Sequence, residues 1–158
     1  MLNDITTYKE SIFQIEKPQD FKYHALWAFQ YQATHNELYK QYLQTLNVDI
    51  NAVSELDQIP FLPIQFFKTH TVTDKYPYDQ VFTSSGTTGA ITSRHYVADK
   101  TIYEASYNKA FQLFYGDVSQ YTILALLPSY LEREGSSLIY MAEDLIKRSG
   151  APASGFYL

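Results

Sequence analysis

A run of hydroxyl and glycine residues between two apolar stretches has the composition of an anion-binding loop. Two glycines lie three positions apart, which lets the backbone adopt conformations that other residues avoid. Backbone N–H groups can then converge on an anion, and four neighbouring hydroxyls add donors without bulk. The pattern predicts a polyphosphate-binding loop between two strands. This SSGTTG loop consists of Ser84, Ser85, Gly86, Thr87, Thr88 and Gly89.

The SSGTTG loop differs from two common glycine-rich phosphate motifs. No lysine follows Gly89, so the loop is not a P-loop, and it does not fit the GxGxxG pattern either. On composition alone, a hairpin connection without a ligand explains the segment equally well. Arg94, just beyond the loop, is either a cation for the phosphates or a surface charge on the second strand.

The SSGTTG loop resembles the phosphate-binding signature of the adenylate-forming enzymes, the acyl-CoA synthetase and luciferase superfamily. That superfamily usually continues with Pro-Lys, whereas Ala90 and Ile91 stand here. Two further stretches resemble one branch, the LuxE-type acyl-protein synthetases. They are IPFLPI with the following FFKT in residues 59–69, and LPSYLEREGSSL in residues 127–138. The first part of the second stretch, residues 127–135, is called the LPSYLEREG segment below. The resemblance covers most of this chain but only the first part of the family's chain.

The resemblance implies ATP-dependent activation of a fatty or aryl carboxylic acid in the presence of Mg²⁺. The carboxylate would attack the α-phosphate, and the acyl group would then pass to an acceptor protein or thiol. The SSGTTG loop and Arg94 would bind the outer phosphates of ATP, and Ser129 and Tyr130 would line the acyl pocket. The neighbouring charges at residues 132–134 form either a solvated loop or an anion contact through Arg133.

The superfamily's acidic metal residue, ribose-binding Asp and catalytic Lys find no match up to residue 158, and the chain has no Cys to carry an acyl group. The catalytic residues therefore stay unassigned. We expect this chain to be the N-terminal part of such an enzyme and to be inactive alone. It would be a truncated form, a proteolytic remnant or a split gene product of that enzyme.

Composition narrows the class of protein. With 158 residues, 46% hydrophobic and 18% charged, the chain predicts one folded domain. A net charge of −5 without a basic run argues against a nucleic-acid partner. The absence of Cys excludes disulfides, and the four His show no metal spacing, so no metal ligands are predicted. No signal peptide is visible, and the longest apolar run is too short to span a bilayer, so we expect a cytoplasmic protein.

The spacing of apolar residues predicts an α/β protein with an N-terminal helical segment, residues 1–46, followed by a partial α/β domain, residues 47–158. The second helix is expected to begin at Asp20, after Pro18 breaks the first. In the later part of the chain, the pattern predicts strands at residues 68–72, on both sides of the SSGTTG loop, at 121–127 and from Phe156. The strand at 121–127 is expected to be buried on both faces. Helices are predicted at 100–115 and 137–149. A sheet that stopped at the strand from Phe156 would expose apolar surface, so we expect self-association or a partner chain that supplies the rest of the sheet.

Two other functions compete with the enzyme. One is a non-catalytic subunit that binds a nucleotide or phosphate, and the other is a helical, aromatic interaction domain in which the loop is incidental. Pyrophosphate exchange separates the enzyme from both, and thermal stabilisation by ATP separates the two alternatives.

Overall fold

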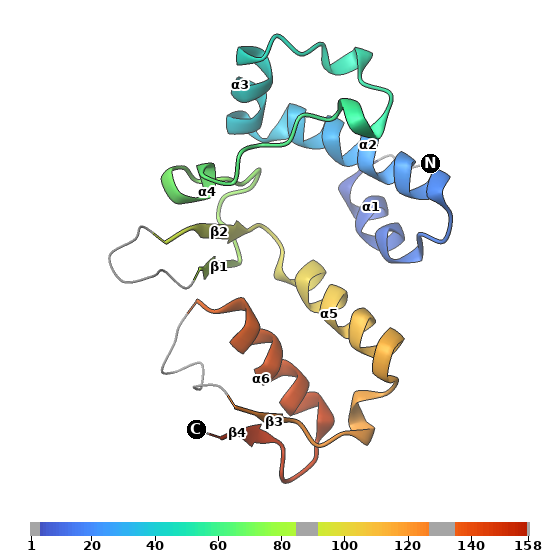
Figure 1. The fold of residues 1–158 in the computed structure, drawn as a ribbon, viewed down its shortest axis with the longest axis vertical. Helices are drawn as coiled ribbons and strands as arrows, with labels where there is room; N and C mark the ends of the chain where they lie inside the picture. The colour runs from blue at the N-terminus through green and yellow to red at the C-terminus, as the bar shows by residue number, and fades with distance from the viewer. Residues whose placement is uncertain (1–3, 85–91, 127–134, 158) are drawn as a thin grey trace. The chain divides into compact units, whose positions relative to one another are not determined.

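The computed structural model describes residues 4–84, 92–126 and 135–157. The chain forms two compact units, Met1–Pro77 and Tyr78–Leu158, which are treated separately (Figure 1). Helices combined with small sheets confirm the broad α/β class. The division expected at residue 46 stays a prediction, and the compact units divide later, after Pro77.

The first unit is helical. Pro18 does not break a helix but is the first residue of one, a position where its missing N–H costs no hydrogen bond; the predicted start at Asp20 is therefore wrong. The helices are α1 (Ile5–Ser11), α2 (Pro18–His35), α3 (Glu37–Thr45) and α4 (Phe66–Thr69), with 3₁₀ turns at Ile12–Gln14, Ile50–Ala52 and Leu56–Gln58.

Asn36 organises the junction between α2 and α3. Its side chain is buried, accepts the backbone N–H of Tyr39 at 3.3 Å as the cap of α3, and donates to Gln32 Oε1 at 3.1 Å. The Tyr39 hydroxyl donates to the carbonyl of Pro60, which ties the later segment to α3, and burial raises the pKa of Tyr39 to about 12. The core around this junction consists of Phe29, Ala33, Tyr39, Leu43 and Val53.

The strand predicted at residues 68–72 is wrong, because helix α4 runs to Thr69 and residues 70–72 form neither helix nor strand. The backbone N–H of Phe66 bonds to the carbonyl of Pro63, and that of His70 bonds to the carbonyl of Phe66. The rings of Phe66 and His70, four positions apart, stack with centroids 4.9 Å apart. The apolar residues thus follow helical rather than strand spacing.

The second unit begins with a hairpin of β1 (Gln80–Thr83) and β2 (Arg94–Val97), antiparallel, which confirms the two predicted strands beside the SSGTTG loop. The predicted helices are confirmed as α5 (Lys100–Tyr115) and α6 (Ser137–Ser149). Asp99 caps α5, and α6 ends at Gly150 with a left-handed φ of 62°. Strand β3 (Leu124–Ala125) pairs in parallel with β4 (Gly155–Phe156).

The prediction of a strand buried on both faces at residues 121–127 is wrong. Only Leu124 and Ala125 form β3, and while Ala125 is buried, Leu124 and Leu126 are exposed. Successive side chains of a strand point to opposite faces, and in this two-stranded sheet only one face is covered. The exposed leucines agree with the expected apolar surface, while self-association stays a prediction.

A polar cluster joins α5 to α6. Asp144 accepts hydrogen bonds from Tyr107 at 2.8 Å, Arg148 Nε at 2.6 Å and Asn108 at 3.4 Å. Burial acts to raise the pKa of Asp144, but these three hydrogen bonds outweigh it and lower the pKa. Burial and the bond to Asp144 raise the pKa of Tyr107. The charged form of Asp144 is therefore the one that stabilises the fold.

We predict that Asp144→Asn destabilises the protein at neutral pH and flattens its loss of stability in acid. Because the folded pKa lies below the unfolded value of 3.8, the contribution of Asp144 is complete above that pH and is lost as pH falls through the folded value. Urea unfolding between pH 7 and pH 3 measures the difference. If the free energy of unfolding fell equally steeply with decreasing pH in the wild-type and Asp144→Asn proteins, the stabilising role of the Asp144 charge would be contradicted. The control is Glu143→Gln, on the same helix.

Candidate functional site

The β1–β2 hairpin closes the base of the SSGTTG loop. The backbone N–H of Ser84 donates to the carbonyl of Ser93 at 3.0 Å, and the N–H of Ser93 donates to the Ser84 hydroxyl at 3.0 Å. The Ser84 hydroxyl therefore accepts one bond within the hairpin. Ser84, the first residue of the loop, and Ser93, which follows the loop, are thus held next to one another.

A second segment is attached at the same point. The backbone N–H of Thr83, directly before the SSGTTG loop, donates to the carbonyl of Gly135 at 2.8 Å. Gly135 ends the LPSYLEREG segment, so the residue before the SSGTTG loop and the last residue of the LPSYLEREG segment meet at this hydrogen bond. The sequence motifs alone did not predict this contact.

Only glycine fits at position 135. Its φ of +81° lies in the region that side chains avoid, and a Cβ there would lie 2.7 Å from Thr83 Oγ1. The close approach of the two backbones therefore depends on the missing side chain, and the glycine that closes the LPSYLEREG segment is the sequence signal for it.

Aromatic side chains hold this junction against α5 and α6. The ring of Phe82, 7% exposed, packs against Tyr103 and Tyr140 with centroids 5.2 Å and 5.6 Å apart. The Tyr103 hydroxyl donates to the carbonyl of Ser137 at 3.0 Å, and Ser136 caps α6. Strand β1 and the start of α6 are therefore positioned together (Figure 1).

Arg94 is an exposed cationic residue beside Thr83. It is the first residue of β2, it is exposed, and Thr83 is its partner across the ladder, so the two side chains lie on the same face of the hairpin. Arg94 makes no ion pair with any residue that the structure describes.

Of the predicted site residues, the structure places Ser84 and Arg94, one on each side of the loop base. The others, Ser85, Gly86, Thr87, Thr88, Gly89, Ser129 and Tyr130, lie outside the described residues. Their predicted roles stay predictions, and the structure adds Thr83 and Gly135 as the residues that join the two segments.

Two further properties concern the described residues only. They contain no group of three or more His, Cys, Asp or Glu side chains that could hold a metal ion. None of their helices combines the length and the apolar character needed to cross a membrane.

The family model described as acyl-protein synthetase, LuxE, matches residues 10–123 of the 158-residue chain. This chain belongs to the LuxE acyl-protein synthetase family. The matched range includes the SSGTTG loop and the β1–β2 hairpin, and it ends before the LPSYLEREG segment. No curated protein and no solved structure matches the chain.

We predict that Gly135→Ala destabilises the second unit by more than Gly150→Ala. Both substitutions put a side chain at positive φ, at a cost of about 1–2 kcal/mol. Only the one at Gly135 also meets Thr83 Oγ1, because nothing lies within 4 Å of a Cβ at Gly150.

Adding Thr83→Ala to Gly135→Ala removes that oxygen and should restore part of the loss. Urea unfolding of the two single variants and the double variant gives the coupling as a mutant cycle. Equal losses for Gly135→Ala and Gly150→Ala, with no coupling to Thr83, would show that the close approach does not matter.

Proposed function

We propose that this member of the acyl-protein synthetase family uses ATP to activate a carboxylic acid and then transfers the acyl group to a protein. A carboxylate oxygen attacks the α-phosphorus of ATP, and the bond to the β-phosphate breaks with release of pyrophosphate. A nucleophile of the acceptor protein then displaces AMP from the acyl carbon. What supports this proposal is the family match together with a hydroxyl- and glycine-rich loop whose base carries an exposed arginine.

The SSGTTG loop would hold the outer phosphates of ATP. Its backbone N–H groups and hydroxyls would neutralise charge as it develops on the departing pyrophosphate. Ser84 would contribute the proton of its hydroxyl, and Arg94 a charged, planar set of donors from the same edge of the hairpin. These donors suit a polyphosphate even though no lysine follows the loop.

The LPSYLEREG segment would contribute to the same site, because the hydrogen bond between Thr83 and Gly135 attaches its last residue to the loop base. Because Gly135 at the end of this segment is bonded to Thr83, Ser129 and Tyr130 would belong to a stretch that ends beside the proposed phosphate site. They would contact the acid that attacks the nucleotide. Mg²⁺ would accompany the phosphates, but the described acidic residues form no cluster for it, so none is assigned as its ligand.

We predict that Gly86→Val abolishes binding of Mg·ATP whereas Thr87→Ala only weakens it. Valine adds a branched side chain where the proposal requires the backbone to approach a phosphate. Loss of one neutral donor costs about 0.5–1.5 kcal/mol, which is a several-fold loss of affinity. Calorimetric titration of the full chain measures both, and circular dichroism with thermal melting shows that each variant is folded.

Unchanged affinity in a folded Gly86→Val protein would mean that the loop is only a connection between strands. Pyrophosphate exchange in the presence of carboxylic acids tests the catalytic part of the proposal. ATP binding without any exchange would instead favour the non-catalytic subunit that binds a nucleotide or phosphate.

A further inference from the structure

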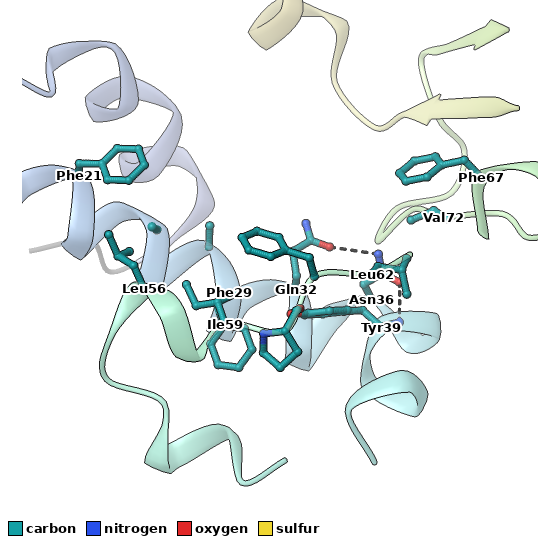
Figure 2. Close-up of a pocket in the computed structure, with 14 residues that line it drawn as sticks. Phe21, Phe29, Gln32, Asn36, Tyr39, Leu56, Ile59, Leu62, Phe67 and Val72 are labelled. Carbon is teal, nitrogen blue, oxygen red and sulfur yellow. Dashed lines mark hydrogen bonds between the residues drawn. The ribbon is translucent and has the colours of Figure 1, made fainter. Parts of the chain in front are cut away.

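Helix α2 carries side chains of two kinds on two of its faces. One face lines an apolar groove together with the segment from Leu56 to Val72, and Phe21 and Phe29 belong to that lining (Figure 2). His24 does not line the groove. Its Nε2 atom instead lies 2.9 Å from the hydroxyl oxygen of Ser11, the last residue of α1. A hydroxyl within hydrogen-bond distance of an imidazole is the arrangement of an activated nucleophile.

A backbone carbonyl fixes which ring nitrogen of His24 carries the proton. Nδ1 lies 2.7 Å from the carbonyl oxygen of Asp20, one turn earlier in α2. A carbonyl oxygen only accepts hydrogen bonds, so Nδ1 is protonated and donates. In the neutral ring, Nε2 is then the acceptor that faces Ser11. The imidazole is thus held in the tautomer and the orientation that a general base for a hydroxyl requires.

The single proton of the Ser11 hydroxyl has three acceptors within reach. The hydroxyl oxygen lies 2.8 Å from the carbonyl oxygen of Thr7 and 3.2 Å from that of Tyr8, besides Nε2 of His24. The Tyr8 carbonyl already accepts the backbone N–H of Ile12. Among the described residues, Ser11 is the only hydrogen-bond partner of Nε2. A proton directed at Nε2 satisfies this otherwise unpaired nitrogen, whereas the Tyr8 carbonyl has a donor without it.

Aromatic rings border this pair of residues. The centroid of the Tyr8 ring lies 5.8 Å from that of His24, and the exposed ring of Tyr23 meets His24 edge-on at 5.9 Å. Ser11 and His24 are themselves half-buried, so both remain partly open to solvent. The two tyrosine rings therefore offer apolar surface to a small acyl group beside the hydroxyl.

We propose that Ser11 and His24 form a nucleophilic site that takes an acyl group from a small carboxylic ester. His24 Nε2 removes the proton of the Ser11 hydroxyl as the hydroxyl oxygen attacks the carbonyl carbon of the ester. The bond from that carbon to the alcohol oxygen breaks, and the proton passes from Nε2 to the departing oxygen. The products are an ester on Ser11 and the free alcohol. Neither ATP nor the SSGTTG loop takes part, so this site is independent of the proposed function.

Incubation of the full chain with p-nitrophenyl acetate, without ATP, tests the proposal. We expect an early burst of p-nitrophenol, and in samples quenched with acid during the burst, mass spectrometry of peptides should locate an acetyl group on Ser11. This mapping uses the unaltered protein, so it does not depend on how a variant folds. Acetylation that leaves Ser11 unmodified would overturn the proposal, and so would the absence of any acetylation.

His35 supplies a matched control for the base. Its Nδ1 lies 2.9 Å from the carbonyl oxygen of Tyr31, one turn earlier in α2, as in His24, but no described hydroxyl contacts its Nε2. His24→Gln should slow the acetylation of Ser11 about a hundredfold, which is the contribution of a general base. His35→Gln should leave the rate unchanged. Equal rates in the two variants would overturn the proposal.

Thr69 supplies a matched control for the nucleophile. Its hydroxyl oxygen lies 2.8 Å from Nδ1 of His70, but no described carbonyl orients the other ring nitrogen of that imidazole. Ser11→Ala should abolish the burst, and Thr69→Ala should leave it intact. Circular dichroism with thermal melting shows whether each variant is folded. A burst of the same size in a folded Ser11→Ala protein would overturn the proposal.

The same assays separate this site from the proposed function. Acetylation of Ser11 by p-nitrophenyl acetate should proceed at the same rate with and without Mg·ATP, and acetylation that requires Mg·ATP would overturn the proposal. Pyrophosphate exchange without acetylation of Ser11 overturns this site and supports the activation of carboxylic acids. Acetylation of Ser11 without any pyrophosphate exchange supports this site and counts against that activation.

Discussion

The backbone hydrogen bond from Thr83 to Gly135 is the constraint on which the candidate site depends. It requires two chain segments to approach more closely than a side chain would allow, so the second segment has to end in glycine. Phe82 then packs against α5 and α6, which fixes the direction in which β1 leaves the core. The base of the SSGTTG loop and the end of the LPSYLEREG segment are thereby held in one place.

The two units use polar residues for different purposes. In the second unit, three donors hold the charge of Asp144, which links α5 to α6. In the first unit, Asn36 bonds to the Gln32 side chain and the Tyr39 backbone, and Tyr39 bonds to the carbonyl of Pro60, beside an apolar groove.

Much of the fold follows from local sequence signals. Asp99 and Gly116 mark the ends of α5, Ser136 and Gly150 mark those of α6, and the alternating residues after the loop indicate β2. The prediction failed where local patterns were ambiguous: the apolar residues around α4 suit a helix as well as a strand. The contact between Thr83 and Gly135 and the apolar groove join segments that are distant in sequence, so no local pattern announces them.

Amide hydrogen exchange with and without Mg·ATP tests the central claim most directly, namely that the SSGTTG loop and the LPSYLEREG segment form one nucleotide site. We expect ATP to slow exchange in peptides from both segments together, because their ends share the hydrogen bond between Thr83 and Gly135. Slower exchange in only one of them, or in neither, would contradict the account.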